Sequence, residues 1–125
     1  MWFPEAQVRV WLYRRPTDMR RSFDGLSAMV KRELGEEPTS GALYVFVNRR
    51  KTLMKVLYFD RAGYCLWSKR LEQGQFQVRW DGACKGALDF TSLQLIIEGI
   101  DTASVRRLKR YQHRQQDRRR ISHPV

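Results

Sequence analysis

The side chains that most often carry out catalysis are sparse in this chain and form no recognisable catalytic set. Asp18 and Asp24 are six residues apart, a spacing that puts them on different faces of a helix. Asp60 falls in a predicted hairpin loop, where aspartate is a routine turn residue. Both histidines, His113 and His123, lie in a strongly basic C-terminal segment. With no metal-ligand spacing, phosphate-loop glycine pattern or nucleophile–base pair, we expect no catalytic residue, no metal, no cofactor and no enzymatic activity.

Basic side chains are the prominent chemical feature. The 125 residues include 24 Lys and Arg against 13 Asp and Glu, a formal net charge of +11. Residues 106–125 contribute +7 of this charge, which leaves +4 for residues 1–105. This uneven distribution suits a polyanion such as nucleic acid. An anionic membrane fits less well, because the C-terminal segment lacks an apolar face rich in Leu, Phe or Trp.

Two groups of cations are candidates for phosphate contact. Arg49-Arg50-Lys51 joins two predicted strands, where adjacent positive charges repel one another unless an anion lies nearby. A solvated turn is the alternative there, and a solubilising end is the alternative for residues 106–125. If that basic arm neutralised about six phosphates, affinity would fall with salt at a log–log slope of roughly −5. The predicted nucleic-acid-binding residues are Arg49, Arg50, Lys51, Lys55, Lys69, Arg70, Arg106, Arg107, Lys109, Arg110, Arg118, Arg119 and Arg120.

The elements that must position these cations begin with a strand over residues 7–13, where apolar and polar side chains alternate. A helix follows, because Met19, Phe23, Leu26, Val30 and Leu34 recur at steps of three and four. Gly35 is the expected end of this helix.

Strands are predicted over residues 43–48, 53–59 and 64–71, with a fourth over 75–80 and a loop over 81–86. Short connections predict antiparallel pairing. A second helix is expected to begin with a capping box at Thr91 and Gln94. The fold class is α+β: a small antiparallel meander of about four to five strands with two helices, comprising residues 1–105, and a basic arm over 106–125.

The predicted register divides the sheet into two faces. One face carries Leu43, Val45 and Val56 and is expected to pack on the first helix. The other mixes aromatic and basic side chains, and its Tyr44 and Phe46 are candidates for stacking on bases. The alternative is that the second helix covers this second face.

Two blocks of sequence resemble a known family. The first is Asp18-Met19-Arg20-Arg21-Ser22-Phe23-Asp24-Gly25-Leu26, and the second extends from Asn48-Arg49-Arg50 to Gly74-Gln75-Phe76. They resemble the TnpB-type accessory proteins of the sixty-six family of bacterial insertion sequences, over roughly residues 4–105. The RNA-guided nuclease of the same name is unrelated. The chain departs from the family pattern at Phe59, at Ser68 and after Phe76.

The resemblance implies a non-catalytic helper encoded beside a transposase that performs the strand chemistry. From the residues we add DNA binding through the basic positions, with RNA left open. The alternative is an adaptor that docks on the transposase without touching nucleic acid. We expect a bacterial cytoplasmic protein, associated with the nucleoid if it binds DNA, because the sequence shows no signal peptide and no membrane span. Cys65 and Cys84 are expected to be reduced thiols.

Overall fold

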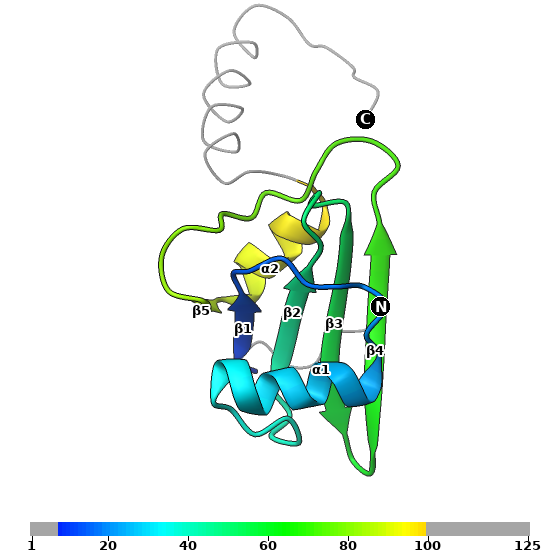
Figure 1. The fold of residues 1–125 in the computed structure, drawn as a ribbon, viewed down its shortest axis with the longest axis vertical. Coiled ribbons are helices and arrows are strands. Elements are labelled where there is room, and N and C mark those ends of the chain that lie inside the picture. The colour runs from blue at the N-terminus through cyan, green and yellow to red at the C-terminus, as the bar shows by residue number, and fades with distance from the viewer. Residues whose placement is uncertain (1–7, 100–125) are drawn as a thin grey trace, which may run out of the picture.

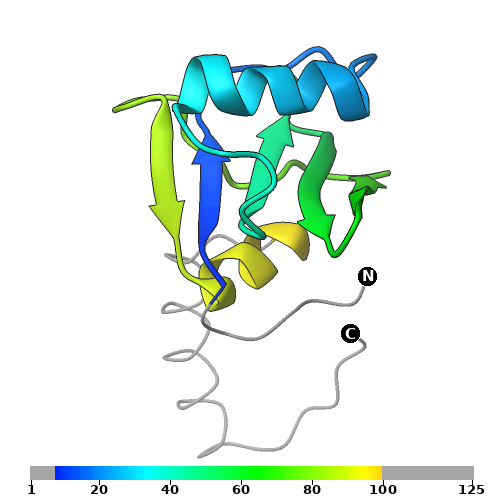
Figure 2. The ribbon, with the colours of Figure 1, turned by 90° about the horizontal axis from the view of Figure 1, so that it is seen from below.

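The computed structural model describes residues 8–99, which form a mixed five-stranded sheet with a helix on each face (Figures 1 and 2). The α+β class is confirmed. The elements in chain order are β1 (Val10–Tyr13), α1 (Phe23–Met29) continuing as the π-helical turn η1 (Val30–Leu34), β2 (Leu43–Val47), β3 (Leu53–Asp60), β4 (Gly63–Arg70), β5 (Lys85–Leu88) and α2 (Phe90–Ile97). The predicted arm, residues 106–125, lies outside the described residues. Within 8–99, no helix is long and apolar enough to span a bilayer.

Strands β2, β3 and β4 form the predicted antiparallel meander, with Val45 opposite Val56 and Val56 opposite Trp67. Strand β1 lies outside this pattern, because it pairs with β2 in parallel, with Val10 opposite Leu43. The helix between them supplies the long crossover that parallel strands need. Strand β5 then pairs antiparallel with β1, so the sheet order is β4-β3-β2-β1-β5.

The division of the sheet into two faces is confirmed, but the predicted covering of those faces is wrong. The face with Leu43, Val45 and Val56 packs on α2 and on buried Phe76. The opposite face, with Tyr44 and Phe46, packs on α1 and η1. Figure 2 shows the two helices on opposite sides of the sheet. Alternation identifies which residues share a face, but both faces are apolar enough to accept either helix.

The first helix is shorter than its apolar stripe predicts. Leu26, Val30 and Leu34 are buried, whereas Met19 precedes the helix and Phe23 is 43% exposed. Gly35 ends the helix with φ +64, as predicted, because this left-handed conformation is open to glycine without a steric penalty.

Three local predictions in the C-terminal third differ from the structure. Residues 75–80 form no strand, although the buried side chains of Phe76 and Val78 alternate inward as strand residues would. Val78 N donates to Phe76 O, a contact within the segment that replaces a ladder bond. The final strand is β5, whose first two residues, Lys85 and Gly86, belong to the loop predicted over residues 81–86. The cap of α2 is Asp89, whose side chain accepts from Ser92 N at 2.6 Å, so Thr91 is not the capping residue.

Candidate nucleic-acid interface

Six basic side chains gather at the end of the sheet where β1 and β2 finish, β3 begins and β4 finishes. We call this group the basic edge. Its members are Arg15, Arg49, Arg50, Lys51, Arg70 and Arg79.

Parallel pairing of β1 with β2 builds the basic edge, because it brings the residues after both strands to the same end of the sheet. Thr17 N donates to Val47 O at 2.9 Å, which fixes the segment after β1 beside the end of β2. Arg15, two residues before Thr17, therefore lies near the β2–β3 turn that carries Arg49 and Arg50. All three arginines are exposed.

The β2–β3 turn is held rigidly by Asn48. Its side-chain oxygen accepts from Thr52 N at 2.8 Å and from Leu53 N at 3.0 Å. Lys51 adopts a left-handed conformation with φ +62, and its carbonyl accepts from Phe76 N at 2.7 Å. This scaffold fixes the backbone that carries Arg49 and Arg50, so their positions vary less than in an unsupported loop.

Trp80 adds an aromatic ring to this cationic surface. Lys51 Nζ lies 5.2 Å from the centroid of the Trp80 ring. Arg15 Nη1 donates to Trp80 O at 3.0 Å, and Arg15 Nη2 donates to Gly82 O at 3.4 Å. The ring is half-buried. Aromatic rings flanked by cations are the usual platform for unpaired bases.

Carboxylates compensate the basic edge only in part. Arg70 Nε lies 3.0 Å from Glu72 Oε2, and Arg79 Nε lies 3.6 Å from Asp81 Oδ1. These pairs are exposed to solvent, where they contribute little stability and yield readily to a competing anion. Among residues 8–99, the other four members of the basic edge have no carboxylate within ion-pair distance.

Two predicted phosphate-binding lysines are occupied by backbone carbonyls instead. Lys55 Nζ donates to Met19 O at 2.7 Å and to Arg21 O at 2.8 Å, so it fastens the segment before α1 to the sheet. Lys69 Nζ donates to Ile97 O at 3.0 Å, where a cation satisfies an end carbonyl of α2 and opposes the helix dipole. Both side chains are half-buried, in keeping with structural roles, whereas Arg15 also donates to backbone carbonyls but remains exposed.

The two predicted stacking residues are fully buried. Tyr44 and Phe46 each have 0% exposure beneath α1 and η1. Tyr44 Oη donates to Glu37 O at 3.0 Å, and burial raises the pKa of this phenol. Neither ring is accessible to a base in this structure, because the helix covers the face that the stacking hypothesis requires.

The described chain ends next to the basic edge. A β-carbon built on Gly99 would lie 3.9 Å from Leu71 Cδ1, one residue beyond the end of β4. The sequence that follows holds the remaining predicted cations, Arg106, Arg107, Lys109, Arg110, Arg118, Arg119 and Arg120, all outside the described residues. The described part of the chain therefore ends beside the residue that follows β4.

Sequence reasoning missed Arg15, Arg79 and Trp80. Arg14-Arg15 was a visible basic pair, but only the parallel strand pairing places it beside residues 49–51. The other arginine of that pair, Arg14, packs over the backbone of β5, with its Cζ 2.5 Å from where a β-carbon on Gly86 would lie. Within residues 8–99 there is no cluster of three His, Cys, Asp or Glu side chains placed to hold a metal, and Cys65 and Cys84 are free thiols.

Comparison with known proteins gives a consistent family assignment. Residues 8–107 match the family described as "IS66 Orf2 like protein". A protein of Sinorhizobium fredii (strain NBRC 101917 / NGR234) named "Uncharacterized protein y4hO" is 41% identical over 101 residues, covering 78% of this chain and 86% of that protein. "Uncharacterized protein y4jC" of the same organism is 31% identical over 106 residues, covering 83% of this chain and 89% of its own length.

No solved structure matches the chain. The family is not a known class of enzyme, and its members are accessory to transposition. The chain belongs to the IS66 Orf2-like family of transposition-related accessory proteins.

Proposed function

We propose that this protein binds DNA through the basic edge and the arm at residues 106–125, and so assists a separate transposase without performing strand chemistry itself. The observation that carries the proposal is the convergence of Arg15 with Arg49 and Arg50 on one exposed end of a rigid sheet. This work would take place beside the chromosome in the bacterial cytoplasm.

Electrostatics supports a phosphate-rich partner. Arginine side chains offer several fixed donors each. Closely spaced cations without local carboxylates bind DNA favourably, because their contacts with phosphates release the counterions condensed on the DNA. Arg49 and Arg50 stand on adjacent residues of a turn fixed by Asn48, so both can contact a single backbone. Such contacts position a protein on DNA but carry no sequence information.

The test is fluorescence anisotropy with a labelled DNA duplex across a salt series, using the full chain. The slope of log affinity against log salt should become less steep by about 2 in the double variant Arg49→Gln/Arg50→Gln, because each lost phosphate contact removes roughly 0.9 from the slope. Truncation after residue 105 should flatten the slope further.

The matched control removes two exposed cations that lie away from the basic edge. Lys31 is on the outer side of η1, and Arg61 is in the β3–β4 turn at the opposite end of the sheet. Asparagine suits the φ of +59 at position 61, so Lys31→Gln/Arg61→Asn should leave both fold and slope nearly unchanged. Absence of binding at low salt, or equal effects of the two double variants, would refute this interface.

A second candidate is the adaptor that docks on the transposase. The observation that favours it is β4, an eight-residue strand at the edge of the sheet, with Phe23 43% exposed on the helix that crosses above it. An unpaired strand edge can accept a strand from another protein.

The two candidates separate in a co-purification experiment with the transposase at high salt. Salt removes phosphate contacts but preserves β-pairing and apolar packing. A complex that survives high salt and is lost in Leu66→Pro, which places a proline within β4, supports the adaptor. Transposition that persists when Arg49→Gln/Arg50→Gln and the truncation have removed DNA binding would favour the adaptor over the interface proposed here.

A further inference from the structure

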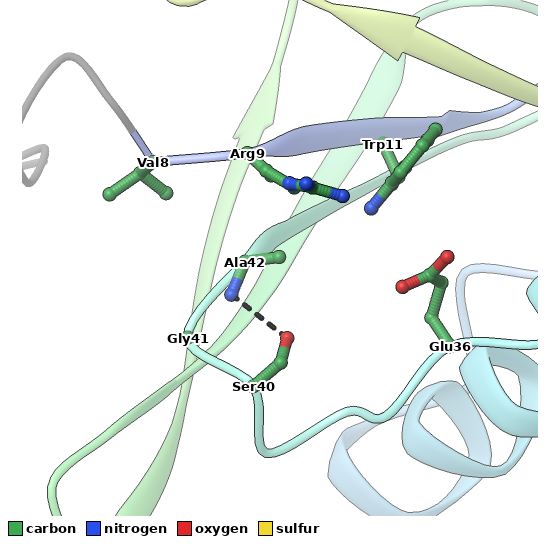
Figure 3. A pocket seen from close by; sticks show the side chains of 7 residues that line it. All are labelled: Val8, Arg9, Trp11, Glu36, Ser40, Gly41 and Ala42. Carbon is green, nitrogen blue, oxygen red and sulfur yellow. Dashed lines mark hydrogen bonds between the residues drawn. The ribbon is translucent and has the colours of Figure 1, made fainter.

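A cavity of about 440 Å³ opens at the end of the sheet opposite the basic edge, where β1 and β2 begin (Figure 3). Residues 8, 9 and 11 line it from β1 and the segment before it, and residues 36 and 40–42 line it from the connection into β2. Its volume falls within the range of small-ligand sites in proteins.

One atom at this cavity is anomalous. The indole Nε1 of Trp11 is buried and has no hydrogen-bond partner, the only side-chain polar atom in this condition within residues 8–99. Buried donors are nearly always paired, because an unpaired one loses its bonds to water without replacement. In Figure 3 this nitrogen points to the side of the cavity where residues 40–42 lie.

The Trp11 ring is held in place by Lys85, which is itself paired with Glu36. Lys85 Nζ lies 4.3 Å from the ring centroid and forms an ion pair with Glu36 Oε2. Both partners of this pair are largely shielded, with side-chain exposures of 31% and 25%. These contacts fix the orientation of the Trp11 ring and of its buried indole N–H at the cavity wall.

A second donor extends toward the first. Arg9 is exposed, and its guanidinium reaches toward the indole nitrogen of Trp11 (Figure 3). Within residues 8–99, no carboxylate lies within ion-pair distance of Arg9. Because Lys85 and Glu36 neutralise each other, the described residues leave one uncompensated positive charge at the cavity, that of Arg9.

From these observations we infer that the cavity binds the carboxylate of an acidic side chain, Asp or Glu, presented by a partner protein. Two carboxylate oxygens match the two donor groups, the Arg9 guanidinium and the Trp11 indole N–H. One negative charge balances the one uncompensated charge, whereas a dianionic phosphate would exceed it. Val8 and Ala42 provide apolar walls for the short aliphatic stem of such a side chain.

The inference is independent of DNA binding, because the cavity and the basic edge lie at opposite ends of β1 and β2.

The experiment follows the Trp11 indole N–H resonance of the ¹⁵N-labelled full-length protein. This resonance is assigned as the one that is missing from the spectrum of Trp11→Phe. The probe is N-acetylglutamic acid α-amide, a blocked glutamate, and its glutamine counterpart is the neutral comparison.

Titration with the blocked glutamate should shift the Trp11 indole resonance saturably, and the blocked glutamine should not. Arg9→Gln should lower the affinity for the blocked glutamate by about tenfold, because a charge-assisted hydrogen bond is lost. Arg61→Asn removes an exposed cation from the β3–β4 turn, at the same end of the sheet but outside the cavity lining, and should leave the affinity unchanged.

Four results would overturn the inference. They are no saturable shift of the Trp11 indole resonance, unchanged affinity in Arg9→Gln, tighter binding of inorganic phosphate, and tighter binding of N-acetylalanine. The last two would assign the cavity to a phosphate or to a chain-terminal carboxylate. Arg9 is exposed, so its substitution leaves the folded protein available for the measurement.

Discussion

Lys51 Nζ lies 5.2 Å from the centroid of the Trp80 ring, across a surface where Arg15 also holds the Trp80 carbonyl. Lys51 belongs to the β2–β3 turn and Trp80 to the long connection between β4 and β5. This pairing places a half-exposed aromatic ring within the basic edge. We therefore propose Trp80, which is partly exposed, for the base-stacking role that the sequence predicted for Tyr44 and Phe46.

Replacing this ring should discriminate between forms of DNA. We expect Trp80→Leu to weaken binding of a single-stranded oligonucleotide by about tenfold, within the range for loss of one stacked base. A duplex of the same length should lose less, because its bases are already stacked on one another. Anisotropy titrations at one salt concentration measure both affinities. Trp80→Phe should retain most of the single-strand affinity, and equal losses for the two DNA forms would contradict the stacking role.

Phe46 should prove to be a core residue with no direct part in binding. Phe46→Ala removes a fully buried ring between the sheet and α1, and should lower the free energy of unfolding by about 3–5 kcal/mol. Urea denaturation measures this change. The fraction that remains folded should bind DNA with unchanged affinity and salt slope. A large loss of affinity in a stably folded Phe46→Ala protein would restore the stacking hypothesis.

Lys55 offers a direct comparison between a structural and a phosphate-binding lysine. Lys55→Met keeps the aliphatic stem but leaves the carbonyls of Met19 and Arg21 without their shared donor. We expect the free energy of unfolding to fall by about 1–2 kcal/mol. The salt slope of DNA binding should not change, in contrast to Arg50→Gln, which should make it less steep by roughly 1. The opposite pattern would show that Lys55 contacts phosphate.

Asp89 should make the stability of α2 depend on pH in the acid range. Its carboxylate accepts the backbone N–H of Ser92, which holds the pKa of Asp89 below its ordinary value of 3.8. Because the pKa of Asp89 is lower in the folded state, this carboxylate stabilises the fold at pH values above 3.8. Its contribution to the free energy of unfolding disappears as the pH falls through the lowered pKa. Asp89→Ala should therefore lower the urea midpoint at neutral pH, with the difference from the native protein shrinking in acid.

Two further variants test the assignment of this cap. Asp89→Asn keeps a neutral acceptor, so its effect on the urea midpoint should be smaller and should vary less with pH. Thr91→Ala alters the residue that the sequence suggested as cap, and should leave the midpoint almost unchanged. A larger effect of Thr91→Ala than of Asp89→Ala would mean that α2 begins differently in solution.

Local patterns in the sequence predicted most of the helices and strands, and also which side chains lie on the same face of the sheet. Hydrophobic alternation over residues 43–71 depends on the pleat of each strand, and the turns keep Val45, Val56 and Trp67 in register on one face. The turn at Arg61-Ala62 is shorter than expected by two residues, an even number, so no side chain changes face. Gly35 likewise ended its helix for a local reason, its left-handed backbone.

Local patterns failed where a residue's role depends on a distant partner. Phe76 and Val78 alternate like a strand, but their side chains pack into the core with α2, and Phe76 N donates to Lys51 O in the β2–β3 turn instead of to a sheet edge. Strand β5 has a weak strand composition, and it forms because β1 offers an open edge. Thr91 and Asp89 both satisfy the composition of a helix cap, and the entry of the chain from β5 selects Asp89.

By itself, the sequence determined that this protein is basic, that its cations concentrate at residues 49–51 and 106–125, and that its blocks resemble an insertion-sequence accessory family. Tertiary structure alone decided which cations share a surface. The parallel crossover from β1 to β2 brings Arg15 close to the turn that carries Arg49 and Arg50. It also covers Tyr44 with α1 and places Lys55 against the segment before α1. Residues far apart in sequence meet through strand pairing, and the choice between parallel and antiparallel partners depends on packing of the whole domain.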